Sequence, residues 1–171
     1  GIFAADERNY VAINFWADSM GAIQKIMQGT IVADGAVLIV DVSGESTDSL
    51  ENVALLLWNM GIDKVVVALN TTDLFDGPTR LNEVRERVRQ IMLQVGLKCL
   101  ACVPVSVRTC ENVRNIEGSD LSNDGLTLLK ALNEFQAQPS LDEQPLRLSL
   151  TSYSDRKGTR FYEGHLRSGV L

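Results

Sequence analysis

The chain has 171 residues with a formal net charge of −6, and 45% of the residues are hydrophobic. That length is enough for one ordinary domain, or for one domain and the start of another. The acidic balance provides no bulk attraction for nucleic acid, and no apolar run approaches the roughly 20 residues that span a bilayer, so we expect neither direct DNA binding nor membrane insertion.

The three cysteines, Cys99, Cys102 and Cys110, favour a reducing compartment, because an odd number in an acidic chain does not suit a disulfide framework. We therefore expect the protein in the cytoplasm. Cys99 and Cys102 lie three positions apart in an apolar run of strand length. Because positions three apart on a regular strand point to opposite faces, the two thiols should be unable to share a ligand. The sequence therefore predicts no metal site.

Apolar runs of strand length alternate with segments of helical periodicity, a pattern typical of a parallel sheet covered by helices. The runs at 35–42, 63–69 and 97–105 are almost continuously apolar, which predicts strands buried on both faces. Trp58 is expected in the core. In chain order, the expected elements are a strand at 9–15, a short helix at 21–31, a strand at 35–42, a helix at 48–60, a strand at 63–69, a helix at 79–95, a strand at 97–105 and a helix at 125–135.

A change of composition near residue 140 predicts a domain boundary. A polar linker that contains Pro139 occupies residues 136–144. Beyond it, residues 145–150 and 159–171 have the pattern of β-strands joined by a turn at 155–158. We therefore expect an α/β domain at 1–138, followed at 139–171 by a linker and the first strands of a β domain. Both ends of the sequence look cut, so we expect a fragment of something longer.

Polar residues follow two of the predicted buried strands. Asn70 and Asp73 come after the strand at 63–69, and Ser106 comes after the strand at 97–105. In open α/β sheets, ligands bind beyond the carboxyl ends of the strands. A carboxylate can accept from N1 and the exocyclic amino group of guanine together, while an amide holds the loop and the base edge. On its own, the Asn-x-x-Asp spacing is also typical of a plain turn.

Several segments together resemble one known family. Residues 10–40 read YVAINFWADSMGAIQKIMQGTIVADGAVLIV, residues 60–73 read MGIDKVVVALNTTD, and residues 102–107 read CVPVSV. In this order they resemble the translational GTPases of the elongation factor 1-alpha superfamily. Residues 111–125 resemble elongation factor 1-alpha and the ribosome-rescue GTPase that partners Pelota more than bacterial EF-Tu. Residues 125–132, 143–150 and 158–171 extend the resemblance into the family's second domain.

The resemblance implies both a fold and a ligand. The expected fold is α/β: a P-loop-GTPase-like parallel sheet with helices on both faces, whose first strand and phosphate loop would precede residue 1, followed by the beginning of a β-barrel domain. The implied ligand is GTP or GDP, and the implied guanine-binding residues are Asn70, Asp73 and Ser106.

The residues that contact phosphate and metal in the family are replaced here. The magnesium-binding Thr falls at Phe3 and the metal-side Asp at Phe15. The glycine that meets the γ-phosphate falls at Asp18, the water-positioning His at Ser19, and the Lys of the guanine motif at Thr71. These changes remove attractions to a polyanion and add a repulsion, so magnesium binding and GTP hydrolysis are not expected.

A shifted motif offers one alternative. Residues 18–21 read DSMG, which satisfies the Asp-x-x-Gly pattern three residues later than in the family. The ungapped match on both sides nevertheless fixes the unshifted register.

Three functional hypotheses follow from the resemblance. The first is a pseudo-GTPase that serves as a binding or scaffold module in translation or ribosome quality control, with a protein or ribonucleoprotein partner such as the ribosome. The second is an authentic GTP-binding elongation or rescue factor whose phosphate loop lies outside this fragment. The third is a decayed paralogue used as a structural subunit of a larger assembly.

Overall fold

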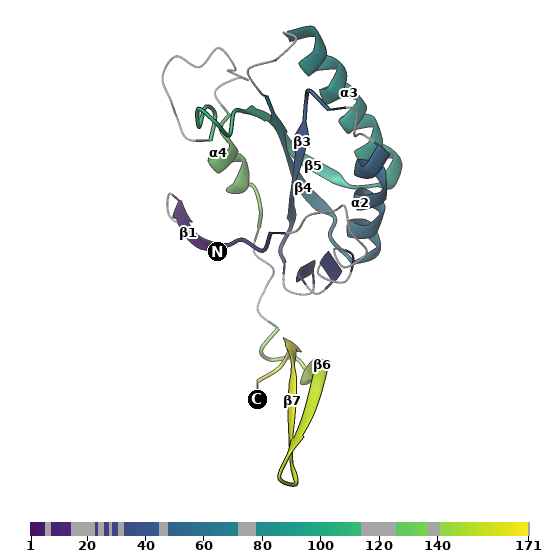
Figure 1. The fold of residues 1–171 in the computed structure, drawn as a ribbon, viewed down its shortest axis with the longest axis vertical. Coiled ribbons are helices and arrows are strands. Elements are labelled where there is room, and N and C mark those ends of the chain that lie inside the picture. The colour runs from purple at the N-terminus through teal and green to yellow at the C-terminus, as the bar shows by residue number, and fades with distance from the viewer. Residues whose placement is uncertain are drawn as a thin grey trace.

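A three-stranded parallel sheet forms the centre of the α/β part (Figure 1). The computed structural model describes residues 1–5, 8–14, 23, 26–27, 29–30, 33–44, 48–71, 78–113, 126–136 and 141–170. Within these residues, β3 (Ala36–Asp41), β4 (Lys64–Asn70) and β5 (Lys98–Val105) lie in the order β3-β4-β5. The crossover from each strand to the next carries a helix, as parallel pairing requires.

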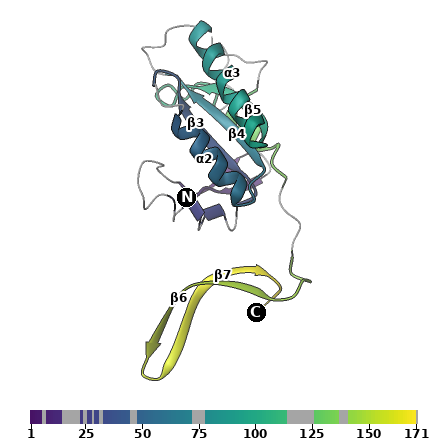
Figure 2. The ribbon, with the colours of Figure 1, turned by 90° about the vertical axis from the view of Figure 1, so that its right-hand side faces the viewer.

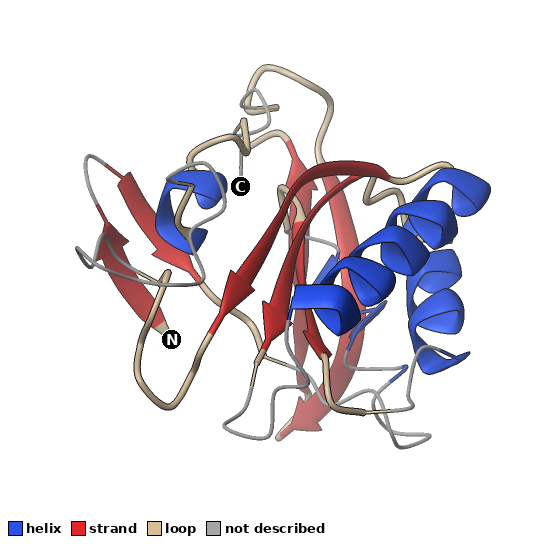
Figure 3. Cartoon of the chain, turned by 90° about the horizontal axis from the view of Figure 1, so that it is seen from above, coloured by secondary structure: helices blue, strands red, loops and turns tan. Residues whose placement is uncertain are grey.

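Helices cover both faces of this sheet. On one face lie α2 (Asp48–Asn59) and α3 (Pro78–Val95), whose apolar side chains join the inward residues of the strands in one core cluster. On the other face, α4 (Leu128–Leu132) closes a smaller cluster. Figure 2 shows α2 and α3 side by side over the sheet, and Figure 3 shows α4 on the opposite side. The predicted fold class is confirmed.

The predicted burial on both faces holds for β4 but is wrong for β3. Residues Val65 to Leu69 of β4 are all buried. In β3, Leu38 and Val40 face the core, whereas Val37 and Ile39 are 41% and 71% exposed. The difference arises because β4 has a strand on each side and helices on both faces, while β3 lies at the edge of the described sheet.

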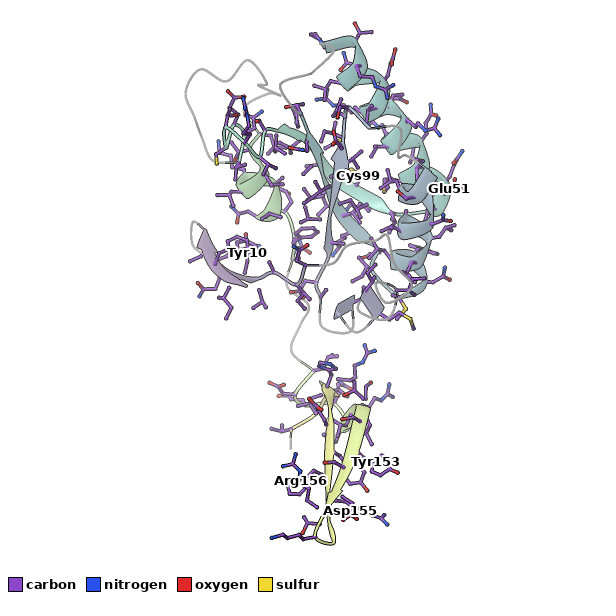
Figure 4. All side chains as sticks on the ribbon, viewed as in Figure 1. Tyr10, Glu51, Cys99, Tyr153, Asp155 and Arg156 are labelled. Atoms are coloured by element: carbon purple, nitrogen blue, oxygen red, sulfur yellow. The ribbon has the colours of Figure 1, made fainter. Side chains whose placement is uncertain are left out.

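An irregularity in β5 reverses the expectation for its cysteines. The register between β4 and β5 shifts between Val65 and Val66, so that Cys99 pairs with Val65 and Cys102 pairs with Val67. Both cysteines pack against the cluster under α2 and α3, and Figure 4 shows Cys99 on that side. The prediction that they point to opposite faces is wrong, because the extra residue of a β-bulge puts them back on one face.

Trp58 also departs from its prediction. It lies in the last turn of α2, with its side chain 46% exposed rather than in the core. Its ring approaches Gly96, which ends α3 with a φ of +91°. A left-handed φ at this position suits glycine, as expected where a helix stops.

A separate antiparallel pair, β1 (Ile2–Ala5) and β2 (Arg8–Val11), lies beside the end of α4. Arg8 Nη1 donates to the carbonyl oxygens of Asn133 and Phe135, at 3.0 and 2.6 Å, and the Tyr10 hydroxyl donates to Asn133 Oδ1. The Phe135 ring covers Gly35, where a Cβ would lie 2.3 Å from it. Only glycine therefore permits this close approach just before β3 begins.

The C-terminal strands β6 (Arg147–Arg156) and β7 (Thr159–Ser168) form the predicted hairpin. Their register brings a set of apolar side chains to one face, namely Leu148, Leu150, Tyr153, Tyr162 and Leu166. These side chains are largely exposed. An amphipathic hairpin of this kind is what the start of a β-barrel presents before further strands cover it.

Other predictions fall wholly or partly outside the described residues. The domain boundary at 138/139 lies in the undescribed stretch 137–140, so it stays a prediction. Of the expected helix at 21–31, residues 23, 26, 27, 29 and 30 are helical, and Ile26 is buried in the core. No helix within the described ranges is both long and apolar enough to cross a membrane.

Candidate functional site

The carboxyl ends of β4 and β5 bring two of the predicted guanine-binding residues together. Asn70, the last residue of β4, pairs in register with Val105, the last residue of β5. Thr71, the residue that follows β4, donates its N–H to the Val105 carbonyl oxygen at 2.8 Å. Ser106 follows Val105 directly, so it begins its loop alongside Asn70.

The Asn70 side chain is oriented by the loop that follows β5. Its Oδ1 accepts the N–H of Val107 at 3.2 Å. The other half of the amide, Nδ2, makes no hydrogen bond to the residues that the structure describes. The side-chain oxygen of Asn70 is therefore bonded to the loop, and the two N–H groups of the amide are not.

Ser106 closes its own loop rather than reaching outward. It is buried, its N–H donates to the Glu111 carbonyl oxygen at 3.2 Å, and its Oγ accepts the N–H of Thr109 at 3.3 Å. Cys110 turns the loop with a φ of +60°. The result is a short loop, residues 106–111, held by its own backbone beside Asn70.

Asn112 connects this loop to β5, and the sequence did not predict this role. Its side chain is buried, and Nδ2 donates to the Pro104 carbonyl oxygen at 3.1 Å. Its backbone carbonyl accepts the N–H of Leu128 at 2.7 Å, which satisfies a donor in the first turn of α4. Its φ of +54° is one that asparagine tolerates better than most residues, but the sequence alone does not show that this asparagine adopts it.

The Thr71 side chain turns back into the sheet. It is 6% exposed, and its hydroxyl donates to the Val105 carbonyl oxygen at 3.2 Å. Thr71 therefore links the ends of β4 and β5 by hydrogen bonds. Its side chain places no charge at the carboxyl edge of the sheet.

The neighbouring end of β3 is also bonded internally. Asp41 Oδ1 accepts from the N–H and the hydroxyl of Ser43, at 2.9 and 2.7 Å. Arg80, in the first turn of α3, directs Nε to the Val42 carbonyl oxygen at 3.4 Å and pairs with Glu83 at 3.5 Å. The arrangement offers polar groups suited to a base edge, and Arg80 beside them is paired with Glu83.

A family profile described as "Elongation factor Tu GTP binding domain" matches residues 23–138, more than half of the chain. The chain belongs to this family. Among its relatives, elongation factor 1-alpha of Thermococcus onnurineus is 26% identical over 151 residues, and that of Methanopyrus kandleri is 28% identical over 155 residues. Each match covers 87% of this chain but only 35% or 36% of the relative, so the chain spans about a third of their length.

Solved structures agree with this fold. Sup35 complexed with GDP superimposes with a TM-score of 0.62 at 19% identity, over 99% of this chain and 42% of that one. The translation elongation factor SelB from Methanococcus maripaludis, in its apo form, gives 0.58 at 21% identity, over 99% of this chain and 35% of that one. The chain thus contains a translational GTPase-like domain, as the sequence predicted.

Of the predicted site residues of this GTP-binding domain, Asn70, Thr71 and Ser106 lie together. Phe3 does not join them: it lies on β1, stacked on Tyr10 with ring centroids 5.1 Å apart. Tyr10 in turn bonds Asn133 beyond the last turn of α4, and Figure 4 shows it there, away from the carboxyl ends of the strands. Asp73, Phe15, Asp18 and Ser19 lie outside the described residues.

Proposed function

We propose that the chain is a translation-factor-like pseudo-GTPase, a binding or scaffold module with little or no GTP hydrolysis. The observation that carries the proposal is the contrast between Asn70 and Thr71. Asn70 keeps an amide oriented for a base edge, with Oδ1 held by Val107. Thr71, at the position of the family's lysine, is uncharged and has its hydroxyl bonded back to Val105.

The remaining support comes from the replaced residues. Phe15 and Phe3 offer no oxygen ligand for magnesium, a hard cation that binds oxygen atoms. Asp18 adds a negative charge where the family's glycine meets the γ-phosphate. Guanine contacts through Asn70 and Asp73 survive in this proposal, with Ser106 holding the loop beside them, and contacts to phosphate and metal do not.

The first test is the titration of a fluorescent guanine nucleotide with and without magnesium. We expect weak binding that GDP and GTP compete away, that ATP does not, and that chelation of magnesium leaves unchanged. Asn70→Asp keeps an oxygen for the Val107 N–H but removes the Nδ2 donor, and Asp73→Asn removes the carboxylate. Each should weaken binding at least tenfold, the effect of losing about 1.4 kcal/mol or more.

Asn82→Asp is the matched control, because it makes the same chemical change on the exposed surface of α3. It should leave binding unchanged. Equal affinity for ATP and GTP, or full binding by both site variants, would show that residues 70–73 are only a turn.

The competing candidate is an authentic GTP-binding translation factor. Membership of a GTP-binding domain family and the retained base-side residues favour it. This candidate places the phosphate loop outside residues 1–171 and requires tight nucleotide binding that depends on magnesium. The same titration therefore separates the two candidates when it is made on the longer protein.

The proposed partner is a protein or ribonucleoprotein particle of the translation machinery. The net charge of −6 favours contact with protein over bare RNA, whose binding falls steeply with salt. We therefore expect the chain to sediment with ribosomes to a similar extent with and without guanine nucleotide, and at both 50 and about 200 mM salt. Absence from the ribosomal pellet under all these conditions would exclude the ribosome as the partner.

A further inference from the structure

We propose that Cys99 and Cys102 form a two-thiolate site for a soft monovalent cation such as Cu(I). The proposal begins with the bulge in β5, which pairs the two cysteines with Val65 and Val67 and so brings both thiols to one face. Both are partly buried against the same core cluster. Since β5 is an edge strand of the described sheet, the pair lies within reach of solvent.

The spacing of the two cysteines suits a bridging metal better than a disulfide. Val65 and Val67 are two residues apart on β4, so their partners lie about 6.6 Å apart along the strand. A disulfide needs Cβ atoms about 3.8 Å apart, which would require the backbone to move. With metal–sulfur bonds of about 2.3 Å, the length found in zinc–thiolate sites, a linear sulfur–metal–sulfur unit spans about 4.6 Å. Each sulfur then has to lean inward by only about 1 Å.

The number of ligands selects the kind of ion. Within the described ranges, no three or more metal-ligating side chains gather at one place. Structural zinc requires four ligands, so two thiolates alone do not suit it. Cu(I) prefers soft sulfur ligands and is satisfied by two of them.

The residues around the two cysteines suit the negative charge of the metal complex that would form. Binding releases two protons: Cu(I) and two thiols give a bis-thiolate complex of charge −1 and two protons. Arg85 and Arg89 of α3 both act electrostatically on Cys102. Arg85 also forms a side-chain hydrogen bond with Cys102, so a negative complex at this place would keep a cation beside it.

Without metal, the site stays protonated. Burial, followed by the neighbouring Cys99, raises the pKa of Cys102 to about 12, and burial also raises the pKa of Cys99.

The test is an anaerobic titration of the full chain with Cu(I) in competition with a chromophoric Cu(I) chelator. We expect one tightly bound Cu(I) per chain. Cys99→Ser and Cys102→Ser should each lower the affinity at least 100-fold, while Cys110→Ser, which changes the exposed cysteine, should leave it unchanged. Retained affinity in either of the first two variants, or its loss in Cys110→Ser, overturns the proposal.

A second measurement guards against variants that fail to fold. In the unmutated chain, bound Cu(I) should slow the alkylation of Cys99 and Cys102 together by N-ethylmaleimide, and leave Cys110 reactive, as read by peptide mass spectrometry. Protection of Cys110 alone, of only one of the pair, or of none overturns the proposal. So does a prompt disulfide between Cys99 and Cys102 in dilute peroxide, because it shows that the sulfurs meet directly.

Discussion

GTP turnover by this chain is expected to equal a buffer blank, with or without magnesium. The rate should lie below about 10⁻⁴ per second, the order of magnitude for an unassisted small GTPase. Catalysis in this class rests on positioning and on charge stabilisation by a metal, a lysine and backbone N–H groups. In this chain the Thr71 hydroxyl is hydrogen-bonded to Val105. We propose that Phe15 and Ser19 stand where the family has its metal-side Asp and water-positioning His.

The measurement is phosphate release over hours at saturating GTP. Restoring a single group should not restore turnover, because the missing groups act as a unit, so Thr71→Lys serves as a control that stays at the blank. Turnover above the blank that disappears in Asp18→Ala or Asp73→Ala would show that the site is catalytic after all.

The largest effect on stability is expected near the carboxyl end of β4. Leu69 is fully buried in the main core cluster. Leu69→Ala should lower the free energy of unfolding by about 2–5 kcal/mol, through lost burial and the cavity left behind. That is a large part of the stability of an ordinary domain.

Ile39→Ala is the matched control on the adjacent strand. Its side chain is 71% exposed, so the change should cost less than about 0.5 kcal/mol. Urea unfolding followed by circular dichroism compares the two variants. Similar losses for both would mean that the outer face of β3 is covered in solution.

The sequence predicts the α/β layers because buried strands and amphipathic helices carry distinct periodicities. It could not predict which face of β3 is covered. Val37 and Ile39 are as apolar as Leu38 and Val40, and their exposure depends only on which elements pack nearby. Continuous apolar character shows that a strand can be buried on both faces, not that it is.

The cysteines illustrate a second limit. A bulge breaks the alternation of faces along β5, and nothing in the apolar run from Cys99 to Val105 marks where the extra residue sits. The positions of Asn70 and Ser106 at the ends of β4 and β5 were predictable because they follow recognisable strands, while their contact with a base stays a prediction. Asn112 was not, because its role depends on a backbone carbonyl and a φ of +54° that its letter alone does not reveal.

The hydrogen bonds of Asn112 also give α4 a mechanical role. The N–H groups of its first turn donate to the carbonyl oxygens of Asn112 and Val113. The carbonyl oxygens just past its last turn accept from Arg8 of β2. A five-residue helix is only about 7–8 Å long, too short to bend appreciably. It therefore connects the loop after Ser106 rigidly to the β1–β2 pair. A displacement of that loop should move α4 as a whole and, with it, the β1–β2 pair.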